Sequence, residues 1–288
     1  MTRDICSASP ATDRAEEPPQ TMEKQIIWRG LLAGAAAGVL SFIFSRIFIE
    51  PVIDQAIGYE DGIGAAHEAL SGATGGHDHG GGGGFEGFTR AVQMNIGMGL
   101  GVLLYSIAIG ALFAVVFAVA YGRVGNISAR LLSLYVAGGM LLSVFIVPAL
   151  KYPPSPPALS LDETLRQRTL LYLLMVALSA ALLVAAVYLG RRLNAKLGVW
   201  NAMLAAAGAY IAATAIVMLV LPTIDETPGP LLDDAGNIVY EGFPADLLYD
   251  FRLFSFGNQL VIYLTIGLVF GAMAAKMLGD KRRDTVSV

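Results

Sequence analysis

The sequence has only one cysteine, Cys6, among its 288 residues. A single cysteine can form neither an intrachain disulfide nor a cysteine cage around a metal. Charge is also scarce, because Asp, Glu, Lys and Arg make up 15% of the chain, against roughly 25% in soluble domains. The formal net charge of −4 argues against nucleic acid as a partner, since surfaces that bind nucleic acid are basic.

Hydrophobic residues, in contrast, are abundant. They make up 55% of the chain, and the mean hydropathy is +0.62. A helix needs about 20 apolar residues to cross a bilayer core, and the sequence contains six runs of roughly that length or longer: 26–49, 91–121, 131–150, 169–189, 200–221 and 259–278. We therefore expect an all-α integral membrane protein, a bundle of about six transmembrane helices surrounded by lipid.

The motifs of common enzymes and pumps are missing. There is no Gly-x-x-x-x-Gly-Lys-[Ser/Thr] loop for nucleotide phosphates, no His-Glu-x-x-His and no Gly-x-Ser-x-Gly. The middles of the second to sixth runs carry no Asp, Glu, Lys, Arg or His, although ionisable groups within the membrane are typical of proton relays. The sequence thus favours a protein that is not an enzyme, has no bound cofactor and uses no buried carboxylate for antiport.

The distribution of charge predicts the orientation. Of the 19 Lys and Arg residues, 13 lie in the N-terminal segment up to Arg29, in the short connections 122–130 and 190–199, or from Lys276 onward. Because cytoplasmic segments are enriched in Lys and Arg, we expect both termini in the cytoplasm and the protein in the plasma (inner) membrane. The tail 1–24 is expected to be disordered, without a signal peptide, and 279–288 to be a basic tail.

The two long connections, 50–90 and 223–258, are expected on the external side as acidic loops. That side holds 16 of the 23 Asp and Glu residues. The segment 234–237, Asp-Ala-Gly-Asn, is typical of a turn. An acidic outer face suits a protein that gathers cations, although it could equally reflect only the scarcity of basic residues there.

The first long connection contains every histidine of the chain: His67, His77 and His79. Imidazoles beside a carboxylate, here Asp78, can bind a borderline divalent metal such as cobalt, nickel, copper or zinc. The glycine-rich surroundings, Gly75–Gly76 and Gly80–Gly84, predict a flexible tether with little preorganisation. We expect weak external capture of metal by these four residues; the alternative is a solvated linker that happens to contain histidine.

The start of the second run offers softer ligands. Met94 and Met98 lie four residues apart and share one helix face, with Asn95 beside them. Their thioether and amide groups are candidate transient ligands along a permeation path. The alternative is core packing, for which methionine is a common choice.

The first run carries glycine at every fourth position, Gly30, Gly34 and Gly38. Such a small-xxx-small face lets a second helix backbone approach closely. It predicts a packing seam against another span, unless it reflects only the general Gly and Ala content of membrane helices.

The runs 131–150 and 169–189 are joined by a stiff connection and predict a helical hairpin. Four of the five residues from Pro153 to Pro157 are proline, which favours an extended polyproline path. Pro148 lies near the end of the first helix and requires a neighbour to satisfy the carbonyl that it leaves free. Tyr152 and Pro153 are candidate functional residues of this cap, Lys151–Pro157; the alternative is a cap that only ties the two helices together.

Two stretches resemble the CbtA family, the predicted cobalt transporter subunit. One is Lys-Tyr-Pro-Pro-Ser-Pro-Pro from Lys151, followed by Arg-Thr-Leu-Leu-Tyr-Leu from Arg168; the family pattern has Asn where this chain has Ser155. The other is Gly-Phe-Pro-Ala-Asp-Leu-Leu, 242–248, which makes Asp246 a further candidate for the pathway or cap. The resemblance, over about 25–278, implies cobalt uptake for cobalamin synthesis and a small one-span histidine-bearing partner called CbtB.

Three hypotheses for the function follow. The first is a permease subunit for a divalent transition metal, with cobalt as the best candidate. The second is an accessory membrane protein that presents metal to another permease, and the third is a structural or sensory membrane protein. The membrane potential could drive uptake of a divalent cation, since it supplies about 4.6 kcal/mol per 100 mV for two charges.

Overall fold

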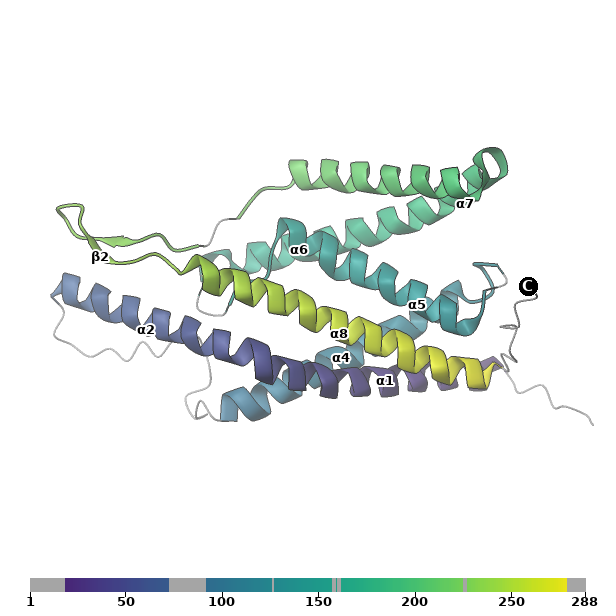
Figure 1. Cartoon of the computed structure of the whole chain (residues 1–288), viewed down its shortest axis with the longest axis horizontal. Coiled ribbons are helices and arrows are strands. Elements are labelled where there is room, and N and C mark those ends of the chain that lie inside the picture. The colour runs from purple at the N-terminus through teal and green to yellow at the C-terminus, as the bar shows by residue number, and fades with distance from the viewer. Residues whose placement is uncertain are drawn as a thin grey trace, which may run out of the picture.

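The protein is described here by a computed structural model that covers residues 19–72, 92–125, 127–156, 159, 162–224 and 227–278. Almost all of these residues are helical (Figure 1). Five helical stretches are long and apolar enough to cross a membrane, which confirms the expected all-α membrane protein: Glu23–Ser71, Met94–Ala120, Ala129–Lys151, Thr164–Val220 and Ala245–Met277.

The individual elements follow one another along the chain with three π-helical turns, η1 to η3, between α-helices. They are α1 (Pro19–Phe44), η1 (Ser45–Ile49), α2 (Glu50–Ser71), η2 (Gln93–Gly97), α4 (Met98–Ala120), α5 (Ala129–Met140), η3 (Leu141–Ile146), α6 (Val147–Lys151), α7 (Asp162–Val220), β1 (Leu231–Leu232), β2 (Ile238–Tyr240) and α8 (Ala245–Met277).

Helix α7 contains two of the expected spans, 169–189 and 200–221, because it folds back on itself at Gly198 (Figure 1). Gly198 has φ 75°, a left-handed conformation that glycine adopts without steric cost. The two limbs pack together through a 2.7 Å hydrogen bond between the hydroxyls of Ser179 and Tyr210. The expected link 190–199 is therefore wrong as a loop, because the chain reverses at one residue; the count of six spans stays a prediction.

The packing seam predicted for the first span is confirmed. Gly30 and Gly34 of α1 face Gly110 and Ser106 of α4 so closely that a Cβ on any of the three glycines would overlap the opposite backbone. Around this seam lies the main core, formed by α1, α4, α5 and α8. Its centre is aromatic, with the rings of Phe113 and Phe117 both edge-on to Phe270.

The connection 50–90, expected as an external loop, is wrong as a loop over its first half, because residues 50–71 form helix α2. With α1 and η1 they make one helix from Glu23 to Ser71. Pro51 does not end the helix, because it directly follows the π-helical turn η1, where the hydrogen-bond pattern has already shifted from the α register. Pro148 follows η3 in the same way. The expected tail is likewise shorter, since α1 begins at Pro19.

The connection 223–258, the other expected external loop, is also more ordered than expected. Strands β1 and β2 form an antiparallel hairpin, and α8 begins at Ala245, directly after Pro244 at its N-cap and 14 residues ahead of the expected span. The predicted turn is confirmed: the Asp233 carboxylate accepts hydrogen bonds from the backbone of Ala235 and from the side chain and backbone of Asn237. These bonds, with that from the Asn237 side chain foremost, lower the pKa of Asp233.

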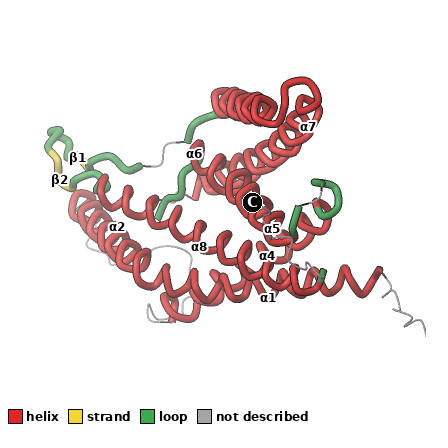
Figure 2. The backbone as a smooth tube through the Cα atoms, turned by 45° about the vertical axis from the view of Figure 1, so that its right-hand side comes forward, coloured by secondary structure: helices red, strands yellow, loops and turns green. Residues whose placement is uncertain are grey.

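The hairpin docks on helix α2. The Tyr59 hydroxyl donates to the carbonyl of Glu241 at 3.2 Å, and the Tyr59 ring lies 5.5 Å from Tyr240 and 4.9 Å from Phe243, centroid to centroid. A second hydrophobic cluster thus joins η1, α2, the β-hairpin segment and the start of α8. Together they form a compact head at one end of the bundle, seen on the left in Figures 1 and 2.

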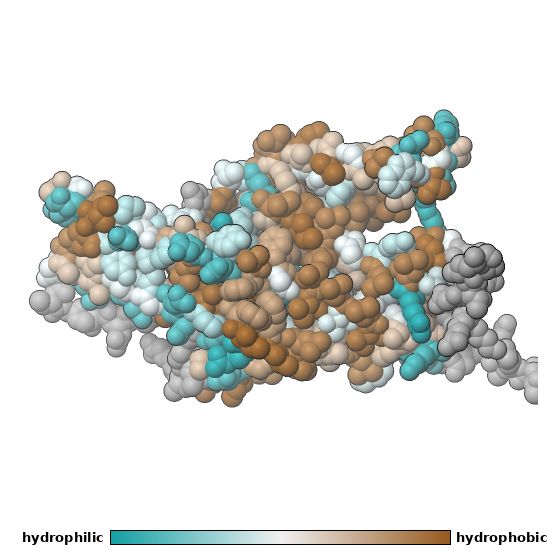
Figure 3. Space-filling model, in the orientation of Figure 1, coloured by the Kyte–Doolittle hydropathy of each residue, from teal (hydrophilic) through white to brown (hydrophobic). Residues whose placement is uncertain are grey.

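The middle of the molecule and its two ends differ in surface hydropathy. The end opposite the head contains the start of α1, the turn before α5, the reversal of α7 and the end of α8 (Figure 1). Hydrophobic residues cover the middle of the surface, whereas hydrophilic ones gather toward both ends (Figure 3). Helix α7 packs on η3 and α6 and buries only 11% of its most apolar window. This distribution fits a protein whose middle lies in lipid.

Candidate functional site

The cap between α6 and α7 lies beside the head. Tyr152 follows the last residue of α6 and is 4% exposed. Its hydroxyl donates a 2.8 Å hydrogen bond to the carbonyl of Pro222, just beyond the end of α7. Burial raises the pKa of Tyr152, so the hydroxyl stays protonated and can donate at any physiological pH. The chain leads from the cap into the start of α7, and this hydrogen bond joins the cap to the segment after the end of α7 as well.

Two arginines from different helices hold the proline backbone. The guanidinium of Arg168 on α7 donates to the Pro153 carbonyl at 2.8 Å, and the Nε of Arg252 on α8 donates to the Pro154 carbonyl at 3.4 Å. The next turn of the cap is fixed by Pro156, which is fully buried. The cap therefore links α6, α7 and α8, as the sequence hypothesis of a fixed loop requires.

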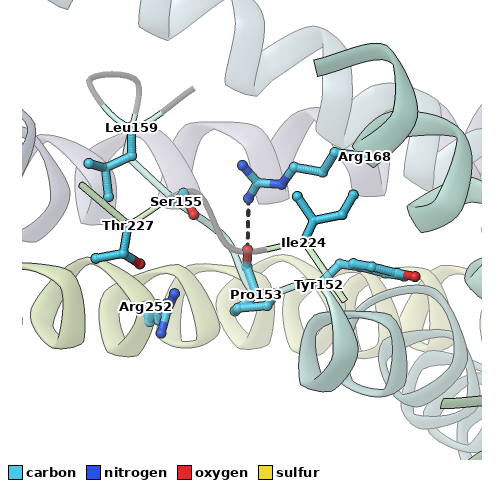
Figure 4. Close-up of a pocket in the computed structure, with 8 residues that line it drawn as sticks. All are labelled: Tyr152, Pro153, Ser155, Leu159, Arg168, Ile224, Thr227 and Arg252. Carbon is cyan, nitrogen blue, oxygen red and sulfur yellow. Dashed lines mark hydrogen bonds between the residues drawn. The ribbon is translucent and has the colours of Figure 1, made fainter. Parts of the chain in front are cut away.

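A small cavity of about 40 Å³ lies between these groups, and a groove of about 420 Å³ adjoins it on the side of α7. Figure 4 shows the Arg168 side chain reaching toward Pro153, with Arg252 across the cavity. The cavity is lined by Tyr152, Pro153, Ser155, Leu159, Arg168, Ile224, Thr227 and Arg252. Guanidinium groups are donors without acceptors, so this cavity suits carbonyls and anions, and it is not a ligand set for a metal cation.

The backbone carbonyl that Pro148 leaves without an N–H donor accepts a hydrogen bond from a neighbouring helix. Pro148 has no N–H to offer to Val144, four residues earlier. The hydroxyl of Tyr172 on α7 donates to that Val144 carbonyl at 3.1 Å. A neighbouring helix thus satisfies the backbone at the proline, which confirms the prediction made for this hairpin.

The proposed metal-capture residues are only partly described. His67 lies near the end of α2 and is exposed; His77, Asp78 and His79 lie outside the described residues. Within the described part of the chain, no group of three His, Cys, Asp or Glu side chains is close enough to hold a metal ion. Asp246 is exposed in the first turn of α8. The described candidates therefore do not converge on one metal centre.

The second set of candidates lies on η2 and the first residue of α4. Met94 and Met98 are half-buried and Asn95 is exposed. Gly99, the next residue, packs beside the Phe42 ring of α1. The half-buried methionines fit the core-packing alternative, and their role as transient ligands stays a prediction.

Sequence reasoning missed a set of neutral polar residues inside the bundle, including Ser41, Ser106, Asn258 and Tyr263. Neutral polar residues in the spans, apart from Asn95, were not among the sequence candidates. The signal was nevertheless present in the sequence, because Asn258 and Gln259 stand next to each other at the start of an otherwise apolar run.

Changing Tyr152 to Phe should lower the stability of the cap. The variant loses the hydrogen bond to Pro222 and leaves that carbonyl without the hydroxyl, at a cost of about 1 kcal/mol. Thermal unfolding of the purified protein in detergent measures the loss. Tyr249→Phe on α8, where the ring is 64% exposed, is the matched control and should leave the unfolding temperature unchanged. An equal effect of both changes would contradict the assigned role of Tyr152.

The fold and the site define a multi-pass, all-helical membrane protein with a compact polar head and a tied cap. The chain belongs to the CbtA family: residues 23–275 match the family described as "Probable cobalt transporter subunit (CbtA)". The resemblance noted in the sequence is thus confirmed, and it supports a role in transport. No curated protein and no solved structure matches the chain.

Proposed function

We propose that the chain is a membrane permease subunit for the uptake of a divalent transition metal, with cobalt for cobalamin synthesis as the cargo. The observation that carries this proposal is the family match over 23–275, which covers all five membrane-length helices apart from the last residues of α8. On this proposal the protein is not an enzyme, and the metal is its substrate.

The head faces outward on this proposal, and both termini lie in the cytoplasm of a cell with the chain in its plasma membrane. Support comes from the excess of Lys and Arg in the segments opposite the head. The reversal of α7 at Gly198 also lies opposite the head (Figure 1). If each limb of α7 crosses the membrane, the chain crosses it six times.

Metal capture would begin on the head. Helix α2 carries His67 and the exposed carboxylates of Asp54, Asp61 and Glu68, and the remaining proposed ligands His77, Asp78 and His79 follow it in the chain. Imidazole and carboxylate suit borderline divalent metals. These residues would raise the local concentration of metal without forming a tight site, and the membrane potential would drive its entry.

A second candidate is an accessory subunit that presents metal to another permease. In either role, a small one-span, histidine-bearing protein resembling CbtB would be a partner. The lack of a group of three metal-ligating side chains in the described part of the chain favours it. Uptake by cells that express this chain alone separates the two: uptake only with a companion protein would identify an accessory subunit.

The test is radioactive cobalt uptake in a strain without its own importers, with nickel and zinc as competitors. Replacing His67, His77 and His79 by alanine should lower uptake at scarce metal and leave it intact at saturating metal, because capture limits the rate only when metal is rare. Asn194→Ala with Asn201→Ala, both exposed near the Gly198 turn, is the control. Loss of uptake at saturating metal would instead make the histidines part of the permeation path.

A further inference from the structure

Neutral polar side chains from α1, α4 and α8 meet between the head and the aromatic core. Ser41 of α1 donates a 2.7 Å hydrogen bond to the Asn258 side-chain oxygen of α8. Next to Asn258, Gln259 accepts a 3.5 Å hydrogen bond from the Tyr105 hydroxyl of α4. Two separate polar links thus join three helices at one level of an otherwise apolar bundle. We call these residues, with Ser106 and Tyr263, the polar belt.

Two hydroxyls of the belt have no partner among the described residues. Ser106 is 0% exposed and faces Gly38 of α1, and its Oγ makes no hydrogen bond. Tyr263 is 1% exposed and lies one helical turn beyond Gln259, and its hydroxyl is also unpaired. The belt therefore offers hydrogen bonds that the described protein itself does not use.

An unpaired hydroxyl in an apolar interior is costly, and buried polar groups in proteins are usually paired with protein atoms or ordered water. The cost applies with more force within a membrane, where lipid offers no partner. The two unpaired hydroxyls at one level of the bundle therefore indicate that the belt holds water or a hydrated ion.

The backbone around the belt is also irregular. The π-helical turn η1 begins at Ser45, one turn after Ser41. The turn η3 packs on α8 through the rings of Phe145 and Phe256, whose centroids lie 4.9 Å apart, and Phe256 is two residues before Asn258. Single π-helical turns occur often at functional sites. The irregular backbone adjoins the polar belt on two sides.

The chemistry of the belt limits what it can bind. Its groups are hydroxyl and amide oxygens, without a carboxylate, imidazole or thiolate among the belt residues. Neutral oxygens replace water poorly around a borderline metal, which prefers nitrogen or sulfur ligands, but they can hydrogen-bond to the waters of a hydrated ion. We propose that the belt is a wet, low-affinity site through which the divalent cargo passes with its water shell. This proposal rests on the proposed transport function.

In the described conformation, the proposed path of the ion is closed beyond the belt. Toward the end opposite the head, the core contains the packed rings of Phe113, Phe117 and Phe270, with centroids 5.1 Å (Phe113) and 4.8 Å (Phe117) from that of Phe270. A hydrated cation cannot pass through interdigitated aromatic rings. Ions held at the belt would therefore wait for these helices to move before they continue.

The first test measures access of water without measuring transport. In a Cys6→Ser background, Ser106→Cys and Ser133→Cys each introduce one thiol at a position that is 0% exposed. Ser133 is the matched control, because its Oγ already donates to the Gly267 carbonyl at 2.7 Å. A permanently charged methanethiosulfonate reagent modifies a thiol only where water lets the thiolate form. Mass spectrometry of the purified protein follows the reaction.

We expect Cys at position 106 to react much faster than Cys at position 133, and millimolar cobalt to slow its reaction. Equal rates at the two positions, whether both fast or both slow, would overturn a wet belt. Reaction at position 106 that cobalt does not slow would overturn the assignment of the cargo to the belt. Thermal unfolding verifies that both variants are folded.

The second test uses a variant that keeps the packing. Tyr263→Phe removes the unpaired hydroxyl and should lower cobalt uptake several-fold at normal abundance in the membrane. Tyr135→Phe on α5, where the ring is 59% exposed, should have no effect. Unchanged uptake by Tyr263→Phe would overturn the proposal. If the unchanged chain carries no metal, the transport function fails instead, and the thiol reaction at position 106 still decides whether the belt is wet.

Discussion

Replacing Gly110 by leucine should prevent α1 and α4 from packing and abolish accumulation of the folded protein. A side chain at this position would overlap the backbone of Gly30 and Gly34, so two long helices would have to separate. Overpacking a well-filled core costs about 1–3 kcal/mol and occasionally more, and a clash between two backbones cannot be relieved by a change of rotamer. Size-exclusion chromatography in detergent and thermal unfolding measure the outcome.

Gly101→Leu is the matched control on the same helix. No atom lies within 4 Å of a Cβ built on Gly101, so its added side chain would meet open space, and leucine favours the helix by about 0.5–1 kcal/mol relative to glycine. We expect this variant to accumulate normally and to unfold at the same temperature or higher. If Gly110→Leu were equally well tolerated, the close approach of α1 and α4 would not be the contact that holds the bundle together.

Changing Arg168 and Arg252 together to methionine should release the cap and destabilise the protein strongly. Each guanidinium donates to a proline carbonyl of the cap, and hydrogen bonds to charged groups contribute about 1.5–3 kcal/mol each. Methionine keeps the length and the apolar stem of the side chain but removes the donors. Thermal unfolding with a quantitative blot of the membrane fraction measures the loss.

The exposed Arg166, on the same turn of α7 as Arg168, provides the control, and Arg166→Met should be neutral. Because both arginines hold one short segment, the second change should cost less after the first, as a double-mutant cycle would reveal. Strict additivity would mean that the two contacts act independently and that the cap is not a single unit.

Local sequence patterns predicted the spans, the Gly30–Gly34 seam and the need for a partner at Pro148, because each depends on residues within one or two helical turns. They did not predict that 50–71 is helical. The apolar run ends at Ile49, whereas the helix continues through the π-helical turn η1 and past Pro51. Helix α2 also depends on Tyr59 binding Glu241, a contact between residues 182 positions apart in the chain. No local pattern reveals such a partner.

Local patterns also failed to reveal the long-range contacts of the candidate sites. The cap was identified from its prolines, but nothing in the local sequence showed that Arg168 of the next helix and Arg252, 98 residues after Pro154, donate to its carbonyls. The polar belt was missed because its residues are neutral and belong to three different helices, and only Asn258 and Gln259 stand out in the sequence. The cluster appears only when Ser41, Tyr105 and Asn258 are brought to one level by the packing of α1, α4 and α8.

The continuity of α1 and α2 makes the head a lever. At about 1.5 Å per residue, the 22 residues of α2 extend roughly 33 Å beyond η1. A tilt of about 5° at η1 would displace the tip by approximately 3 Å on the same rise per residue. Since Tyr59 ties α2 to the segment just before α8, such a tilt would also pull on the helix that carries Asn258 and Gln259. Forces that act on the far end of α2 are thus transmitted mechanically to α8.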